Sequence, residues 1–207
     1  MPGRKFKAIG FDIGGVILPS ERQRLYSYCQ AVFGAPVDEI ESAINSHLND
    51  LETGSINLDQ FWKDVTKSLG VDYNAKVDRA LWADHYIADT PVRTELLELS
   101  DRLRQRGYKT GLLSNTHAEH AILNRYRHIF NHFDAAVLSH EIHAVKPEPE
   151  AFLALCKALE VLPSDTIFID DLATNVAGAE RVGMVGLEYF GYQDLVQKLN
   201  QLGIEAN

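Results

Sequence analysis

A carboxylate and two glycines follow the first apolar segment of the chain. Asp12 comes at the end of the apolar run of residues 6–11, and Gly14 and Gly15 stand just beyond it. The run has the composition of a buried β-strand, and the glycines allow the chain to turn at its carboxyl end. Ligands of open α/β sheets bind at this edge, where a carboxylate can act as a nucleophile or a metal ligand. Taken alone, the pattern also fits a purely structural turn.

Polar side chains recur at three later points. One apolar run ends in the hydroxyl of Ser114 and the amide of Asn115, and another ends in the adjacent carboxylates of Asp170 and Asp171. Between these runs, Lys146 stands just before a Pro-Glu-Pro segment that predicts the start of a helix. Most of these groups therefore stand at expected strand ends, where a ligand would bind.

Taken together and in this order, these groups resemble the four sequence motifs of the haloacid dehalogenase superfamily of phosphatases. The match spans nearly the whole chain. The spacing of Asp170 and Asp171 from Asn175, Ala179 and Gly183 is typical of the fourth motif, in which Asn175 would orient the acidic pair. The resemblance implies an α/β fold, a Rossmann-like doubly wound parallel sheet with an inserted bundle of helices that the family calls a cap.

The resemblance also implies roles for the polar side chains. Asp12 would attack phosphorus and form an aspartyl-phosphate, which splits one difficult step into two. Ser114 and Asn115 would donate hydrogen bonds to the phosphoryl oxygens, and Lys146 would neutralise the charge of the phosphate. Each residue also has a structural interpretation, as a turn cap, a strand end or a surface lysine.

A magnesium site is a further implication of the resemblance. Mg²⁺ prefers hard oxygen ligands, a few from the protein and the rest from water or phosphate. Asp12, the backbone carbonyl of Gly14 and Asp171 would bind the ion directly, whereas Asp170 would act from the second shell of groups around it. Gly14 and Gly15 would also line the position of the phosphate.

The histidines do not suggest a second metal site. The chain has eight histidines, but no cysteine or glutamate completes a set of metal ligands with them at the usual spacing. His117 follows the Ser-Asn-Thr segment directly, so we consider it a candidate for the rim of the pocket.

The chain departs from the usual family pattern at Gly14. Most family phosphatases have a second aspartate there, which protonates the leaving group and later activates water. A branch of the family carries glycine instead, and this chain resembles that branch, including the Glu-Thr-Gly-Ser-Ile stretch of residues 52–56. The branch includes sugar-phosphate phosphatases and sequences similar to the phosphatase-like domain of epoxide hydrolases. General acid–base help contributes about 10²–10⁴-fold, so its loss favours good leaving groups such as an anomeric sugar oxygen.

The sequence therefore predicts a Mg²⁺-dependent phosphohydrolase that acts on small soluble phosphate monoesters, with sugar phosphates as one option. The main alternative is a catalytically weak protein that binds a phosphorylated ligand in the same pocket. This alternative remains because Gly14 replaces the aspartate that usually acts as the acid. A phosphomutase is disfavoured because transfer back to a product hydroxyl needs the missing acid. A haloacid dehalogenase is disfavoured because those enzymes need no metal, which would leave Asp170 and Asp171 unexplained.

Size and composition are those of a soluble globular protein. The chain has 207 residues, 45% of them hydrophobic and 24% charged, and its net charge is −9. An acidic chain without a basic stripe is a poor nucleic-acid binder, and no apolar run approaches the ~20 residues of a membrane span. Cys29 and Cys156 fit reduced core positions of a cytoplasmic protein, and the N-terminal apolar run is too short for a signal peptide. We expect a small phosphorylated metabolite as the partner and leave the oligomeric state open.

Strand and helix patterns alternate from Thr90 onward, which indicates a parallel sheet with helices on both faces. Thr90 and Pro91 predict the N-cap and first turn of a helix that Gly107 ends. The other elements expected here are strands near 110–115, 135–138, 166–171 and 185–187, and helices near 117–127, 148–160, 173–182 and 192–201.

Residues 20–89 differ because they show helical periodicity and little strand character. We therefore expect an α/β core of residues 1–19 and 90–207 and a helical cap of residues 20–89. Apolar stripes predict four helices in a small bundle, the third of them opened by Asn57. The stripes are Leu25, Tyr28, Cys29, Val32 and Phe33; Ile40, Ile44, Leu48 and Leu51; Leu58, Phe61, Trp62, Val65 and Leu69; and Val77, Leu81 and His85.

Overall fold

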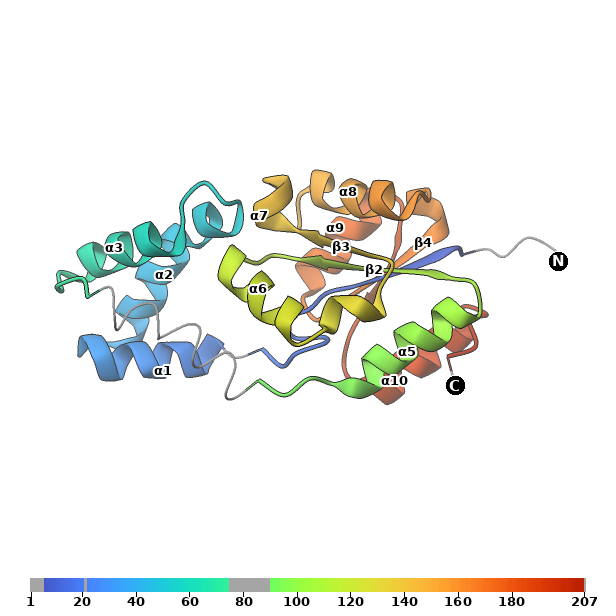
Figure 1. The fold of residues 1–207 in the computed structure, drawn as a ribbon, viewed down its shortest axis with the longest axis horizontal. Helices are drawn as coiled ribbons and strands as arrows, with labels where there is room; N and C mark the ends of the chain where they lie inside the picture. The colour runs from blue at the N-terminus through green and yellow to red at the C-terminus, as the bar shows by residue number, and fades with distance from the viewer. Residues whose placement is uncertain (1–5, 21, 75–89, 207) are drawn as a thin grey trace.

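A parallel β-sheet forms the centre of the molecule. The computed structural model describes residues 6–20, 22–74 and 90–206, and helices flank the sheet in its ribbon (Figure 1). The five strands lie in the order β3-β2-β1-β4-β5, and all pairs are parallel, which confirms the expected α/β fold. The strands are β1 (Ala8–Phe11), β2 (Lys109–Ser114), β3 (Ala135–Leu138), β4 (Thr166–Asp170) and β5 (Val185–Glu188).

Strand β1 occupies the middle of the sheet. All of its residues are buried, as expected for a parallel strand covered on both faces. Phe11 is aligned with Leu112 of β2 on one side and with Ile169 of β4 on the other. The residues that follow these three strands therefore emerge together at one edge of the sheet.

Helices cover the two faces of the sheet in separate hydrophobic clusters. One cluster contains Leu96 of α5 and Leu195 of α10, and the other contains Leu155 of α8 and Ala179 of α9. Among the described residues, no helix has the length and apolar character needed to cross a membrane. The helices of this part are α5 (Thr94–Gln105), α6 (Ala118–Tyr126), α7 (Ser139–Ile142), α8 (Pro149–Leu159), α9 (Ala173–Arg181) and α10 (Tyr192–Gln201), with 3₁₀ turns at Ile129–His132 and Pro163–Asp165.

Among the described residues between β1 and α5, three helices share a hydrophobic cluster of their own. They lie at one end of the molecule, beyond the edge of the sheet (Figure 1). Phe61 and Trp62 are fully buried in this cluster. The third helix begins as predicted, because Asn57 Oδ1 accepts a hydrogen bond from Gln60 N at 2.9 Å. The helices of this segment are α1 (Arg22–Phe33), α2 (Val37–Glu52) and α3 (Leu58–Leu69).

The helical segment differs from its prediction in two respects. On α1, Tyr28 and Val32 are exposed, whereas Tyr26 is buried. Tyr26 and Tyr28 are both aromatic and two residues apart, so periodicity alone could not decide which one faces the core. The fourth stripe, around Leu81, falls outside the described residues. The division of the chain at residues 20 and 89 stays a prediction.

The helix that follows this segment begins later than the sequence predicts. Helix α5 starts at Thr94 with Arg93 at its N-cap position, so Thr90 is not the cap. Thr90 is buried, and its carbonyl oxygen accepts a hydrogen bond from Arg127 Nη2 at 2.5 Å. The prediction was wrong because a Thr-Pro pair fits either a helix start or an extended linker, and tertiary contacts decide between them.

The end of α2 contacts the sheet-bearing part of the molecule at the short helix α7. Ser139 Oγ donates a hydrogen bond to the carbonyl oxygen of Glu52 at 2.5 Å. His143, directly after α7, places its Nδ1 2.8 Å from the carbonyl oxygen of Thr53. His143 has a φ of 56°, in the left-handed region that glycine adopts most readily. These contacts fix where the helical segment meets the carboxyl edge of the sheet.

Candidate active site

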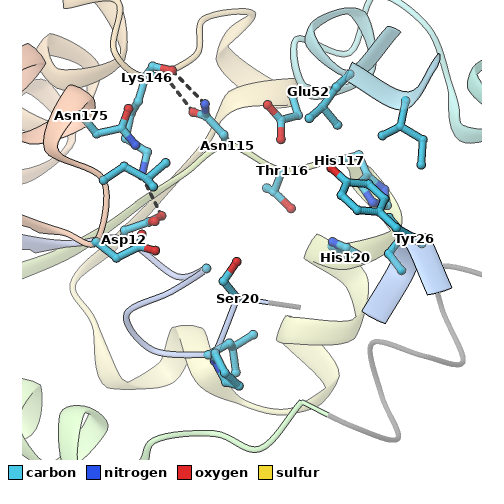
Figure 2. Close-up of a pocket in the computed structure, with 18 residues that line it drawn as sticks. Asp12, Ser20, Tyr26, Glu52, Asn115, Thr116, His117, His120, Lys146 and Asn175 are labelled. Atoms are coloured by element: carbon cyan, nitrogen blue, oxygen red, sulfur yellow. Dashed lines mark hydrogen bonds and ion pairs between the residues drawn. The ribbon is translucent and has the colours of Figure 1, made fainter. Parts of the chain in front are cut away.

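Asp12 lies at the end of β1, at one side of a pocket (Figure 2). Its side chain is buried, and Oδ1 accepts a hydrogen bond from Ile13 N at 2.7 Å. Lys146 Nζ lies 2.7 Å from the same carboxylate. Burial raises the pKa of Asp12 to about 7, against the opposing effect of Lys146 and with a further contribution from Asp170. Burial thus favours the neutral form of this carboxyl, and the ammonium of Lys146 favours its ionised form.

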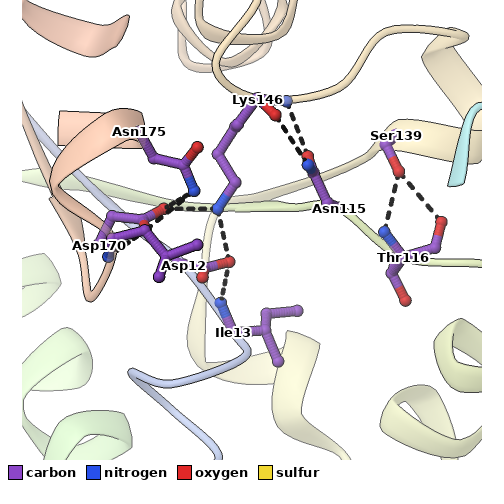
Figure 3. A network of polar contacts seen from close by, with 9 residues as sticks. Asp12, Ile13, Asn115, Thr116, Ser139, Lys146, Asp170 and Asn175 are labelled. Carbon is purple, nitrogen blue, oxygen red and sulfur yellow. Dashed lines mark hydrogen bonds and ion pairs between the residues drawn. The ribbon is translucent and has the colours of Figure 1, made fainter. Parts of the chain in front are cut away.

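Lys146 joins two of the carboxylates (Figure 3). Its Nζ lies 2.7 Å from Asp12 Oδ1 and 2.6 Å from Asp170 Oδ2, and its side chain is only 1% exposed. Burial disfavours the ammonium form, but the charges of Asp12 and Asp170 outweigh this effect and raise the pKa of Lys146. The lysine is therefore a fixed cation next to the candidate nucleophile.

Asn115 holds the backbone of this lysine. Its side-chain nitrogen donates to the Lys146 carbonyl oxygen at 2.9 Å, and its side-chain oxygen accepts from Lys146 N at 2.8 Å. The resemblance assigns the Asn115 amide to the phosphoryl oxygens, and in the structure its side-chain oxygen and one of its two N–H groups bond to the lysine backbone. Asn115 therefore positions Lys146, and its role as a donor to phosphate stays a prediction.

Asp170 is the most enclosed of the acidic residues, with no exposed surface. Its carboxylate accepts hydrogen bonds from Leu172 N at 3.0 Å and from Asn175 Nδ2 at 3.0 and 3.2 Å, in addition to the Lys146 contact. Asn175 thus holds the first member of the acidic pair, as its place in the fourth motif suggested. With its oxygens occupied in this way, Asp170 is suited to orient other groups.

Asp171 lies against the glycine turn that follows β1. A Cβ on Gly15 would be 2.1 Å from the Asp171 carboxylate, and Gly15 has a φ of 86°, so this position requires glycine. Asp12, Asp170 and Asp171 each offer one oxygen within 4.8 Å of one another. Such a set of carboxylate oxygens fits the preference of Mg²⁺ for hard ligands.

The predicted site residues divide into those at the surface of the pocket and those behind it. Asp12, Gly14, Asn115, Lys146 and Asp171 line the pocket. Ser114, Gly15 and Asp170 are buried and are not among its described lining residues. Ser114 is the last residue of β2, the strand next to β1.

The pocket extends from Asp12 towards the helical segment and has a volume of about 280 Å³. Its far wall is partly apolar, because Leu25, Tyr26 and Ile44 come from α1 and α2. Glu52 and His120 also line it. None of these five was selected from the sequence as a site residue. The only signal was the Glu-Thr-Gly-Ser-Ile stretch that begins at Glu52, since the residues of the two helices could be recognised only as core.

His117 lines the pocket, as expected, but on the side opposite Asp12 (Figure 2). It is 3% exposed, and its Nδ1 lies 3.0 Å from Glu119 Oε2. Burial lowers the pKa of His117, and Glu119 opposes this effect. Its ring lies 4.0 Å from that of His120, centroid to centroid. His117 therefore lines the part of the pocket that lies away from Asp12.

The central strand, the buried carboxylate–lysine cluster and the acidic pair together are the features of a haloacid dehalogenase-like enzyme. A family model described as a haloacid dehalogenase-like hydrolase matches residues 6–183. The chain therefore belongs to the haloacid dehalogenase-like hydrolases, which confirms the resemblance found in its sequence.

Curated relatives are named as phosphatases. Phosphatase MT3486 of Mycobacterium tuberculosis (strain CDC 1551 / Oshkosh) is 28% identical over 86% of this chain and 84% of its own length. D-ribitol-5-phosphate phosphatase of Bacteroides thetaiotaomicron is 25% identical over 86% of this chain and 88% of its own length. These relatives confirm the expectation of a hydrolase of the phosphatase type.

A solved structure with bound ligands has the same fold. It is a haloacid dehalogenase family enzyme from Bacteroides thetaiotaomicron, in complex with magnesium and inorganic phosphate. The TM-score is 0.72 at 26% sequence identity, and the match covers 88% of this chain and 93% of that one. Magnesium and phosphate are thus bound by a protein of similar fold.

Proposed function

We propose that the protein is a Mg²⁺-dependent phosphatase that hydrolyses small phosphate monoesters through an aspartyl-phosphate on Asp12. The proposal rests above all on Lys146 Nζ, which lies 2.7 Å from Asp12 and 2.6 Å from Asp170 beside a pocket that Asp171 also lines. A nucleophilic carboxylate, a fixed cation and an acidic pair are the groups that phosphoryl transfer requires.

The reaction proposed for these residues has two steps. Asp12 attacks phosphorus, the bond from phosphorus to the leaving oxygen breaks, and water then hydrolyses the acyl phosphate and restores the carboxylate. Lys146 balances the charge of the phosphoryl oxygens, and Ser114 is proposed to donate a hydrogen bond to one of them. Gly14 and Gly15 line the phosphate position in this proposal.

The metal ligands proposed for this chain are all oxygen atoms. Asp12, the Gly14 carbonyl and Asp171 would hold Mg²⁺ directly, and Asp170 would orient the neighbouring groups. This division is supported by the hydrogen bonds that already occupy the Asp170 carboxylate, three of them from Leu172 and Asn175. When bound, the ion would supply positive charge that stabilises the transferring phosphoryl group.

Sugar phosphates and related polyol phosphates are the proposed substrates. A pocket of about 280 Å³ with both apolar and polar walls suits a small leaving group that carries hydroxyls. Gly14 offers no acid to protonate the leaving oxygen, so within this class an anomeric sugar phosphate should react faster than a primary alkyl phosphate such as that of a polyol. One relative is named for D-ribitol 5-phosphate, which belongs to the same class of phosphate monoester.

Residues 20–89 are proposed to form the cap that selects the leaving group. The support is that α1 and α2 contribute Leu25, Tyr26, Ile44 and Glu52 to the pocket. A cytoplasmic location stays a prediction from the two buried cysteines.

The first prediction concerns Asp12→Asn. The purified wild-type protein should hydrolyse members of a sugar- and polyol-phosphate panel with Mg²⁺ and lose this activity in chelator. Asp12→Asn should lower kcat by about 100-fold or more while the protein stays folded, because the amide is close in shape but cannot attack. Asp72→Asn, at an exposed position, is the matched control and should keep the wild-type rate.

Two results would contradict the proposal. A folded Asp12→Asn protein with more than about a tenth of the wild-type rate would exclude Asp12 as the nucleophile. A wild-type protein that binds phosphate esters and Mg²⁺ but hydrolyses none of the panel would instead support the catalytically weak binding protein.

A further inference from the structure

The backbone carbonyls after Asp12 converge on one arginine. Arg93 Nη1 donates hydrogen bonds to the carbonyl oxygens of Gly15 at 2.7 Å, Val16 at 2.5 Å and Leu18 at 3.4 Å. The backbone N–H of Arg93 donates to the carbonyl oxygen of Ile17 at 3.0 Å. One residue from a distant part of the sequence thus bonds to four successive carbonyls of the loop.

The guanidinium suits this position chemically. Converging carbonyl oxygens create a negative potential, and an arginine offers a permanent charge with several N–H donors in a rigid plane. The guanidinium also lies 5.5 Å from the ring centroid of Tyr189, which limits its movement. Leu18 N donates to the Ile13 carbonyl at 2.8 Å, so the ends of the loop are joined as well.

The same loop also borders the pocket. Gly14 lines the pocket, and Gly15 packs so closely on Asp171 that an added Cβ would be 2.1 Å from its carboxylate. Asp12 itself is held where the loop begins, since its N–H donates to the Ile169 carbonyl at 2.9 Å. Any displacement of the loop would therefore move Gly14 and change the space available to Asp171.

Arg93 also has a special place along the chain. The loop of residues 13–18 is where the chain leaves the sheet for the helical segment, and Arg93 is at the N-cap position of α5, where the chain has returned. Arg93 therefore links the segment in which the chain leaves the sheet for the helical segment to the segment in which it returns.

We propose that Arg93 is a positioning residue for the metal and the nucleophile, which it holds through the loop of residues 13–18. The inference rests on the proposed function, in which the Gly14 carbonyl, Asp12 and Asp171 bind Mg²⁺. Arg93 touches neither the substrate nor the metal in this proposal. It fixes the loop of residues 13–18. The Gly14 carbonyl of this loop is a proposed metal ligand, and its glycine turn packs against Asp171.

The test compares Arg93→Met with Arg93→Lys in the full chain. Methionine keeps the length of the side chain without its donors, whereas lysine keeps a charge and donors with less reach. Calorimetry with Mg²⁺ alone should show the dissociation constant raised about tenfold in Arg93→Met and by less in Arg93→Lys. With a phosphate ester, kcat should fall in the same order, while KM changes by less than about twofold.

Arg127→Met is the matched control. Arg127 donates to the Thr90 carbonyl, close to the segment in which the chain returns to the sheet, but it does not bond to the loop of residues 13–18. Its removal should lower the melting temperature without changing Mg²⁺ affinity by more than about twofold. Equal losses of Mg²⁺ affinity in Arg127→Met and Arg93→Met would overturn the proposal, because they would show a general effect of stability.

The remaining outcomes also decide the matter. Wild-type Mg²⁺ affinity and kcat in Arg93→Met would overturn the proposal. If Arg93→Met does not fold, wild-type Mg²⁺ affinity in Arg93→Lys would do so. A wild-type protein that binds Mg²⁺ but hydrolyses no ester would overturn the proposed function alone, since the affinity comparison still reports on Arg93. A wild-type protein that binds no Mg²⁺ would overturn both.

Discussion

At the scale of single residues, the site depends on charges that have been removed from water. Asp12, Asp170 and Lys146 are all buried, and isolated charges in such a place would be costly. They are tolerated because the ammonium contacts both carboxylates and because Asn175 and backbone N–H groups satisfy the remaining oxygens. Removal of Lys146 would leave two carboxylates facing each other, so this residue supports the structure of the site as well as its chemistry.

Gly14 gives the sharpest test at this scale. A Cβ at Gly14 would meet no atom within 4 Å, and the positive φ of the turn belongs to Gly15. Gly14→Asp should therefore be accommodated and could supply the acid that this branch of the family lacks. We expect primary alkyl phosphates to be hydrolysed about tenfold or more faster, and an aryl phosphate to gain less because its leaving group needs little protonation.

Gly14→Asn is the control for this change, since it has nearly the same shape without an acidic proton. An equal gain in Gly14→Asn would attribute the effect to the shape of the loop. No change in a folded Gly14→Asp protein with either substrate would mean that another group already performs the proton transfer.

The identities of the site residues could be predicted from sequence better than their partners. The order of motifs selected Asp12, Lys146 and Asp171, which the structure brings to one pocket. It did not reveal that the Asn115 amide bonds to the Lys146 backbone, because side-chain contacts between distant segments leave no local pattern. The hydrogen bonds of Arg93 to the loop of residues 13–18 were missed for the same reason.

At the scale of elements, the sequence predicted the strands well because buried parallel strands are short apolar runs. The strand expected near 135–138 is β3, Ala135–Leu138, and the helix expected near 192–201 is α10, Tyr192–Gln201. Helix α7 was missed because Ser139–Ile142 is a single turn, too short for periodicity. The start of α5 was misplaced because Arg93 is engaged with the loop of residues 13–18, which no local rule could indicate.

The turn between β1 and α1 can be tested with Gly15→Ala. Alanine would be strained at a φ of 86° and would also displace Asp171, whose carboxylate is 2.1 Å from the new Cβ. Gly70→Ala is the matched control, because Gly70 has a φ of 68° but no neighbour within 4 Å. Both variants should lose about 1–2 kcal/mol of stability from backbone strain.

Only Gly15→Ala should also weaken Mg²⁺ binding, by about tenfold or more. Unfolding in denaturant and calorimetry with Mg²⁺ measure the two effects separately. Unchanged Mg²⁺ affinity in Gly15→Ala would argue against Asp171 as a direct ligand.

At the scale of the whole molecule, the buried nucleophile couples folding to pH. The pKa of Asp12 is raised to about 7 in the folded protein, mainly by burial, whereas an aspartate in the unfolded chain has a pKa of about 3.9. Between these values the folded state binds more protons than the unfolded state. Through this residue, stability should therefore be highest at low pH and fall as pH rises towards 7.

Asp12→Asn isolates this effect, because asparagine does not titrate. In chelator, the melting temperature of the wild-type protein relative to that of Asp12→Asn should decrease from about pH 4.5 to pH 7.5, since each pKa unit corresponds to about 1.4 kcal/mol. A difference that stays constant, or one that grows with pH, would show that Lys146 holds Asp12 ionised throughout this range.

The register of the sheet determines the spacing between Asp12 and Asp170. Phe11 is aligned with Ile169, so Asp12 and Asp170 follow at the same level on neighbouring strands. Adjacent strands are about 4.8 Å apart, a spacing that the backbone fixes regardless of sequence. The distance between the two strands that carry Asp12 and Asp170, whose carboxylates contact the Lys146 ammonium, is thus set by the backbone of the sheet. Changes in the helices, loops and pocket walls around the strands would leave this spacing of Asp12 and Asp170 intact.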